Sequence, residues 1–183
     1  MTNHETEIRN ALTKYEALLR SQLERVERIN TAGDAVDYTK LDKITIGVCG
    51  GDGIGPIITD ASAKVLEYLL ADDVRRGRIV FKHIDGLTIE NRAAHMQAIP
   101  DDVMAELKSC DVILKGPTTT PRAGDPWPNI ESANVAMRKA LDLFANVRPV
   151  RVPDKGIDWT FFRENTEGEY VLGSRGVEIP DTL

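Results

Sequence analysis

Apolar residues in the first part of the chain recur with the period of an amphipathic helix. Between Ile8 and Ile29 they are spaced alternately by four and three positions, with charged residues between them and an interruption at Gln22. The stripe consists of Ile8, Leu12, Tyr15, Leu19, Val26 and Ile29. This spacing predicts one helix, which ends in the Asn- and Gly-containing segment 30–34. The stripe has two possible roles, packing on the chain's own domain or contact with another subunit.

From Lys43 onward, short β-branched runs alternate with helical patterns. Strands are expected at 44–48, 79–84, 112–114, 144–150, 159–162 and 170–179, and helices at 57–70, around 104–107 and at 133–143. Strands separated by helices favour an α/β fold with a mostly parallel sheet and right-handed crossovers. The sheet is expected to be incomplete, because the chain stops at 180–183 without a closing element. Residues 1–42 are interpreted as a helix and linker, and residues 43–183 as the α/β part.

Composition narrows the classes of partner. The 183 residues carry a formal charge of -6, with 42% hydrophobic and 28% charged residues. A globular domain is expected, and nucleic acid is not, since phosphate binding requires a clustered excess of Lys and Arg. The polar amino terminus and the short apolar runs indicate neither signal peptide nor membrane association, so a cytoplasmic location is expected. Cys49 and Cys110 are expected to be buried free thiols.

A glycine turn follows the strand at 44–48 and opens the next helix. Its sequence is Gly50-Gly51-Asp52-Gly53-Ile54-Gly55-Pro56. A helix amino terminus in this position can bind an anion. The glycines lack the spacing of the Gly-x-Gly-x-x-Gly dinucleotide fingerprint, and no Walker-type Gly-Lys-Ser/Thr follows. The segment is therefore either a ligand-binding turn or a purely structural one.

The candidate binding residues lie further along the chain. A hydroxyl-rich loop, 115–121, directly follows a predicted strand, where open α/β sheets bind ligands. In the next helix Ser132 can cap the first turn, while Asn134 and Arg138 are four residues apart on one face. Further arginines follow at Arg148 and Arg163. Guanidinium groups bind carboxylates bidentately, so together they suit a polycarboxylate, although each alone is typical of a surface ion pair.

Five motifs in order carry a resemblance. The chain is similar to the isocitrate and isopropylmalate dehydrogenases, metal-dependent decarboxylating dehydrogenases, over about residues 43–179, which correspond to their amino-terminal half. The motifs are Gly51-Asp52-Gly53-Ile54-Gly55-Pro56, Lys115-Gly116-Pro117 with its threonines, Ser132-Ala133-Asn134-Val135 with Arg138-Lys139, Leu141-Asp142-Leu143-Phe144-Ala145-Asn146-Val147-Arg148-Pro149, and Arg163-Glu164-Asn165-Thr166-Glu167-Gly168-Glu169-Tyr170. The resemblance implies that family's fold, which is not Rossmann.

The resemblance also assigns roles. It implies that NAD or NADP accepts a hydride from the hydroxyl-bearing carbon, and that Mg²⁺ or Mn²⁺ assists decarboxylation. Arg138, Arg148 and Arg163 match the arginines that bind substrate carboxylates, and Tyr170 matches the acid that protonates the product carbon. Ser132 and Asn134 match the isocitrate-type pattern and favour isocitrate over isopropylmalate. The cofactor-binding positions are Gly51, Gly53, Ile54, Thr119 and Thr120.

The resemblance further implies what this stretch lacks. The family's metal-binding aspartates, its catalytic lysine and most of its adenosine site lie in the second half, so no metal ligand is expected here. Glu131 also places a negative charge beside the predicted carboxylate site. We therefore expect part of a homo- or hetero-oligomeric isocitrate-type enzyme, inactive alone. Alternatives are a regulatory or assembly subunit that binds a tricarboxylate, a truncated chain, and a 3-isopropylmalate or homoisocitrate dehydrogenase.

Overall fold

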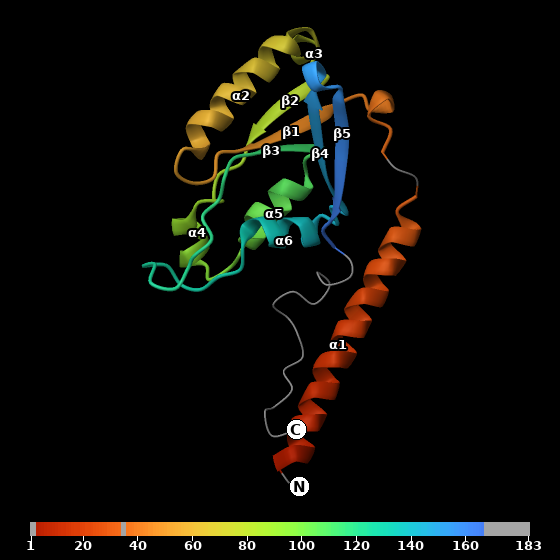
Figure 1. Cartoon of the computed structure of the whole chain (residues 1–183), viewed down its shortest axis with the longest axis vertical. Coiled ribbons are helices and arrows are strands. Elements are labelled where there is room, and N and C mark those ends of the chain that lie inside the picture. Colours follow the sequence, from red (N-terminus) through yellow and green to blue (C-terminus); the bar gives the residue numbers. More distant parts are fainter. Residues whose placement is uncertain (1–2, 34–35, 167–183) are drawn as a thin grey trace. The chain divides into compact units, whose positions relative to one another are not determined.

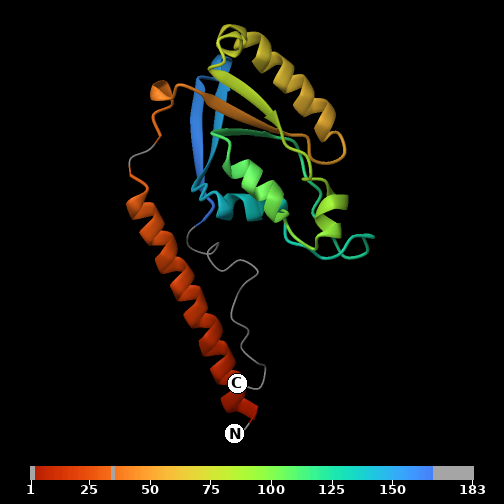
Figure 2. The same ribbon diagram turned by 180° about the vertical axis from the view of Figure 1, so that it is seen from behind.

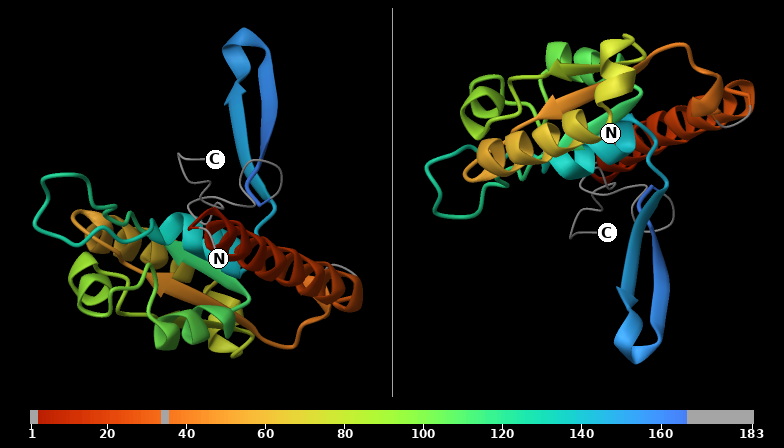
Figure 3. Two further views of the ribbon diagram at one scale, coloured as in Figure 1. Left: turned by 90° about the horizontal axis from the view of Figure 1, so that it is seen from below. Right: turned by 90° about the horizontal axis from the view of Figure 1, so that it is seen from above.

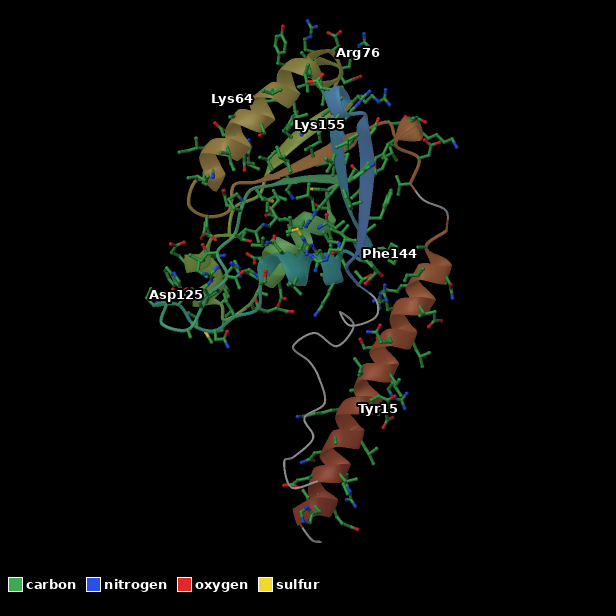
Figure 4. All side chains as sticks on the ribbon, viewed as in Figure 1. Tyr15, Lys64, Arg76, Asp125, Phe144 and Lys155 are labelled. Carbon is green, nitrogen blue, oxygen red and sulfur yellow. The ribbon has the colours of Figure 1, made fainter. Side chains whose placement is uncertain are left out.

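The computed structural model describes residues 3–33 and 36–166, and these divide into two units. In the first unit, helix α1 (Asn3–Thr31) carries the predicted apolar stripe, and its side chains, including Tyr15, are largely exposed (Figure 4). The helix extends five residues before the stripe begins. Within the described residues, no helix is both long enough and apolar enough to cross a bilayer.

The second unit, residues 38–166 of the described chain, contains the other helices and strands. In chain order they are a short 3₁₀ helix (Tyr38–Lys40), β1 (Ile44–Cys49), α2 (Gly55–Leu69), α3 (Ala71–Arg75), β2 (Ile79–His83), α4 (Ile89–Ala94), α5 (Asp101–Lys108), β3 (Val112–Lys115), α6 (Ala133–Ala140), β4 (Ala145–Val152), a second 3₁₀ turn (Pro153–Lys155) and β5 (Ile157–Glu164). The short helices α3 and α4 were not among the elements expected from the sequence.

Strands β1, β2 and β3 form a parallel sheet in the order β2-β1-β3. Helix α2 covers one face of the sheet and helices α5 and α6 cover the other (Figures 1 and 2). Side chains of β1 alternate between the two layers, as the period of two in a strand requires. Ile46 and Val48 pack with Ala63 of α2, whereas Cys49 packs with Leu107 of α5 and Met137 of α6. The prediction of a parallel α/β sheet with an amino-terminal helix is thereby confirmed.

Strands β4 and β5 are the main departure from the expected parallel sheet. They pair with each other, antiparallel, from Ala145↔Glu164 at one end to Val152↔Ile157 at the other. Figure 3 shows this two-stranded hairpin extending away from the layered part of the unit. The connection is a tight turn in which Gly156 has a φ of 64°. Because such a turn leaves no room for a crossover helix, an antiparallel arrangement follows.

Candidate functional site

The glycine turn and the loop after β3 touch backbone to backbone. The Asp52 amide donates to the Pro117 carbonyl at 2.8 Å, and the Gly116 amide donates to the Cys49 carbonyl at 2.8 Å. Gly51 has a φ of +71°, and a Cβ at this position would overlap the Pro117 carbonyl oxygen. A Cβ on Gly116 would likewise overlap the Gly50 carbonyl oxygen. Glycine is therefore required on both sides of the contact, which gives the turn a structural role whether or not a cofactor also binds there.

The same contact is held by two charged side chains to which the sequence analysis gave no role. The Asp52 carboxylate accepts hydrogen bonds from the backbone amides of Ile89 and Thr119, each at 2.7 Å. Arg92, which is 0% exposed, donates to the backbone carbonyls of Ala98, Thr119 and Glu131. Burial lowers the pKa of the Arg92 guanidinium and the negative charge of Asp52 opposes that shift, but an arginine remains a cation. Nothing in the local pattern distinguishes Arg92 from a surface arginine.

Lys115 brings a further cation to the start of the hydroxyl-rich loop. Its ammonium donates to the Gly116 carbonyl at 2.9 Å and to the Thr118 hydroxyl at 3.1 Å. Burial lowers the pKa of Lys115, and the positive charges of Arg92 and Arg138 act in the same direction. The start of helix α6 is joined to this loop through Arg92, whose guanidinium donates to the carbonyls of both Thr119 and Glu131. A region with several cations is suited to an anionic ligand.

Helix α6 presents the predicted Ser-x-Asn-x-x-x-Arg residues beside this loop. Its Ala133 and Met137 are buried in the core, so Asn134 lies exposed and Arg138 partly exposed. The prediction that Ser132 caps the helix with its side chain is wrong, since Ser132 occupies the cap position without such a hydrogen bond. The Glu131 carboxylate lies 3.4 Å from the Lys139 ammonium. This ion pair offsets the negative charge that Glu131 brings to the site.

The hairpin places Arg148 and Arg163 on one face. Arg148 pairs with Phe161, and Arg163 pairs with Asn146, two residues before Arg148, so the two arginines are diagonal neighbours across the strands. The Arg148 side chain donates to the Asn146 side chain at 3.1 Å. The ladder continues one step beyond the base of the hairpin, because the backbone amide of buried Asn165 donates to the Phe144 carbonyl at 2.9 Å. Phe144 is labelled at this base in Figure 4.

A cavity of about 710 Å³ lies on the other side of the glycine turn, between α2 and the segment that follows β2. Gly50, Gly51, Thr59 and His83 are among its lining residues. Of the predicted cofactor-binding residues, Gly51 lines the cavity, whereas Thr119 and Thr120 do not. The arginines predicted to bind substrate do not line it either. Thr119 is partly buried in the loop after β3, and Thr120, Gly53 and Ile54 are exposed. The cavity therefore meets the predicted site only at the turn.

The predicted residues thus form two separate groups in the structure. One contains the glycine turn, the Thr119 loop and α6, and the other contains Arg148 and Arg163 on the hairpin. Tyr170 and the predicted strand 170–179 lie outside the described residues. Within the described residues, no three His, Cys, Asp or Glu side chains are grouped so that they could hold a metal ion. Cys49 and Cys110 are free thiols, and Cys49 is buried while Cys110 is partly exposed.

Comparison with known proteins decides the family. The model of the isocitrate/isopropylmalate dehydrogenase family matches residues 45–180. The chain belongs to this family of decarboxylating dehydrogenases. It is 36% identical over 150 residues to the NADP isocitrate dehydrogenase of Caldococcus noboribetus, and 31% identical over 159 residues to 3-isopropylmalate dehydrogenase 1 of Bradyrhizobium diazoefficiens. It is also 34% identical over 132 residues to a mitochondrial protein of Arabidopsis thaliana, regulatory subunit 3 of NAD isocitrate dehydrogenase.

The fold of this family member agrees with a solved structure. The β-decarboxylating dehydrogenase of Thermococcus kodakarensis matches with a TM-score of 0.56 and 31% identity, covering 68% of this chain and 35% of that one. The three sequence alignments cover 76%, 78% and 69% of this chain but only 32%, 41% and 32% of those relatives. The chain therefore spans about a third to two fifths of the length of these relatives.

Proposed function

We propose that this chain supplies the carboxylate-binding part of an oxidative decarboxylase that acts on isocitrate or a close homologue with NAD or NADP. The observation that carries the proposal is the junction of the hydroxyl-rich loop with the start of α6, where the Lys115 ammonium donates to the Thr118 hydroxyl and Arg92 donates to the carbonyls of Thr119 and Glu131. In this proposal Ser132 and Asn134, at the start of α6, supply hydrogen-bonding groups for an additional carboxylate. The net reaction converts a 2-hydroxy polycarboxylate and NAD(P)⁺ to a 2-oxo acid, carbon dioxide and NAD(P)H.

The roles of the chain's own residues follow from their chemistry. Arg138, Arg148 and Arg163 bind and orient the substrate carboxylates, since a guanidinium pairs with a carboxylate in fixed geometry. Tyr170 protonates the carbon from which carbon dioxide departs, because a phenol retains its proton at neutral pH and can act as a general acid. Thr119 and Thr120, with the turn at Gly51, Gly53 and Ile54, position the cofactor.

The proposal takes the metal and most of the cofactor site from outside this stretch. When bound, NAD(P) takes up the hydride and a divalent Mg²⁺ or Mn²⁺ stabilises the negative charge that develops on decarboxylation. In this proposal the metal ligands come from another segment or from a second chain in a homo- or hetero-oligomer, as the family resemblance implies. A cytoplasmic location stays a prediction.

The test is NAD and NADP reduction with isocitrate, homoisocitrate or 3-isopropylmalate and Mg²⁺. The chain is assayed alone and with a polypeptide that supplies the remaining length of the family's fold. We expect turnover only in the mixture, lost in Arg138→Ala and Tyr170→Phe. Arg151→Ala is the matched control, since Arg151 is an exposed arginine on the same strand as Arg148 but on the opposite face. Robust turnover by the chain alone would contradict the proposal that part of the active site comes from another segment or chain.

A regulatory subunit is the second candidate, favoured by the similarity to the Arabidopsis protein. In that case the cationic region binds a tricarboxylate without turning it over, and Tyr170 has no chemical task. Calorimetry would then show isocitrate binding that Arg138→Ala abolishes. Tyr170→Phe would leave the activity of the complex unchanged, in contrast to its effect on a catalytic site.

A further inference from the structure

The peptide groups of Thr119 are held from both sides by opposite charges. Its amide donates to the Asp52 carboxylate at 2.7 Å, and its carbonyl accepts from the Arg92 guanidinium at 2.8 Å. Asp52 belongs to the glycine turn and Arg92 to helix α4, so two separate segments fix one residue of a third. Asp52, Arg92 and Thr119 are called the Thr119 clamp below.

Arg92 extends the clamp to the far end of the loop. The guanidinium that binds the Thr119 carbonyl also donates to the Glu131 carbonyl at 3.2 Å, and its Nε donates to the Ala98 carbonyl at 2.7 Å. Thr119 and Glu131 are the two ends of the segment whose outer part is marked by Asp125 in Figure 4. One buried side chain thus fixes where this loop leaves and where it returns. Helix α6 begins two residues after Glu131, with Ser132 between them.

The Asp52 carboxylate orients the element that carries Arg92. Its second oxygen accepts the amide of Ile89, the first residue of α4, at 2.7 Å, and Arg92 follows one helical turn later. Asp52 also donates its own amide to Pro117. The carboxylate and the guanidinium are therefore parts of one network that spans the glycine turn, α4, the Thr119 loop and the start of α6.

Burying a guanidinium is costly in free energy, and an apolar side chain could fill the same volume without that cost. The planar fork with five donors, however, can bind three carbonyls in fixed relative positions, which neither a lysine nor a methionine can do. Arg92 is fully buried and its three partners lie 6, 27 and 39 residues away in sequence. This arrangement indicates that Arg92 fixes the relative positions of the three carbonyls and does not primarily stabilise the fold.

We propose that Asp52 and Arg92 are positioning residues, which hold the Thr119 loop and the start of α6 in the relative geometry that the substrate and nicotinamide require. The consequence for catalysis rests on the function proposed above, whereas the clamp itself does not. A displacement of about 1 Å in a substrate-positioning group can cost about a hundredfold in rate, so a rigid connection between Thr119 and Ser132 has direct catalytic value.

Amide hydrogen exchange in the full chain tests the clamp without any assay of activity. Asp52→Asn keeps the side-chain shape but leaves one of the two amides without an acceptor oxygen, and Arg92→Lys keeps the charge but loses the fork. We expect exchange at Thr119 or Ile89 to accelerate at least about tenfold in Asp52→Asn, while amides of β1 stay unchanged and report an intact fold. Unchanged exchange at both amides in the folded variant would overturn the clamp.

The control is Asp125→Asn, because Asp125 accepts one backbone amide, that of Arg122, within the exposed part of the same loop. It should leave exchange at Thr119 and Ile89 unaltered. Acceleration in this variant equal to that in Asp52→Asn would show a general loosening of the loop and would contradict the proposal.

The catalytic consequence is measured on the chain assembled with the remaining part of the family's fold. Asp52→Asn should lower kcat at least about tenfold with KM for the hydroxy acid within about twofold, because Thr119 positions the cofactor in the function proposed above. Arg92→Lys, which frees Glu131 as well, should lower kcat and raise KM. Unchanged kcat and KM in both variants would refute the positioning role. If no polycarboxylate is bound or oxidised by the unmodified protein, the proposed function fails while the exchange result still decides the clamp.

Discussion

At the scale of single residues, Gly51 carries the closest packing in the candidate site. Its φ of +71° is unfavourable for other residues, and a Cβ there would overlap the Pro117 carbonyl oxygen. Gly53 has a similar φ of +60° but open space around its Cα. Gly51→Ala should therefore destabilise the fold by more than about 4 kcal/mol, and Gly53→Ala by only about 1–2 kcal/mol. Denaturant unfolding measures both, and equal losses would show that backbone conformation alone explains the glycine at 51.

Cys49 gives the stability a dependence on alkaline pH. Burial raises the pKa of its thiol to about 11, and a negative charge on nearby Cys110 acts in the same direction. The folded state thus retains a proton that the unfolded chain loses above about pH 9, so this contribution is complete below about pH 9 and is lost as pH rises through about 11. Between these pH limits, the free energy of unfolding of the unmodified chain should fall by roughly 2 kcal/mol more than that of Cys49→Ala.

The comparison with Cys49→Ala is needed because Lys115 has the opposite dependence. Its pKa is lowered by burial, so its contribution to stability rises with pH between the lowered value and that of the unfolded chain. Equal slopes of unfolding free energy against pH for the two proteins would show that the Cys49 thiol titrates alike in the folded and unfolded states.

Individual residues also show how far the sequence could lead. The turn glycines, Ser132, Asn134 and Arg138 were identified as candidates because motifs preserve their spacing. Arg92 could not be found in this way, because its three partners are backbone carbonyls whose approach depends on the tertiary structure. Asp52 belongs to the glycine-turn motif, yet its two backbone amide partners lie 37 and 67 residues away in sequence. No local sequence pattern could therefore predict these hydrogen bonds.

At the scale of elements, helix α6 divides its faces between core and site. Met137 is buried with Cys49 and Leu107, whereas its neighbour Arg138 is partly exposed beside Lys115. Met137→Ala should cost about 2–5 kcal/mol of stability because it leaves a cavity, and Arg138→Ala less than about 1 kcal/mol. Arg138→Ala should instead weaken isocitrate binding at least about tenfold by calorimetry. Loss of binding in a fully folded Met137→Ala protein, with none in Arg138→Ala, would reverse this assignment.

The predicted elements were correct where hydrophobic period and turn signals agreed, as in β1, α2 and β3. The sequence analysis predicted both strands of the hairpin but not that β4 pairs with β5, because a run such as Trp159 to Phe162 indicates extended backbone without indicating its partner strand. The hairpin becomes visible only when the turn at 153–156 is considered, in which Pro153 starts a tight turn and Gly156 adopts a left-handed conformation. Helices α3 and α4 were missed because each is shorter than two turns.

At the scale of the whole molecule, the parallel sheet has three described strands, of which β2 and β3 each pair only with β1 in the described part of the chain. Parallel sheets are normally covered on both faces and extended at their edges. Helix α2 has large apolar side chains exposed on its outer side, including Ile57 and Tyr68. If the proposed function is correct, a polypeptide that supplies the remaining groups should pack on these surfaces.

This arrangement predicts which strand gains protection when the enzyme is completed. In the function proposed above, the metal and the cofactor act beside the loop that follows β3, so a polypeptide that supplies their ligands should cover the edge of β3 that faces away from β1. Hydrogen exchange measured by mass spectrometry should slow in residues 112–115 on assembly, in parallel with the appearance of turnover. Residues 46–48 of β1 are the internal control, because they are already paired with both β2 and β3. An assembled, active enzyme in which β3 exchanges as fast as in the isolated chain would show that completion of the site does not involve this edge of the sheet.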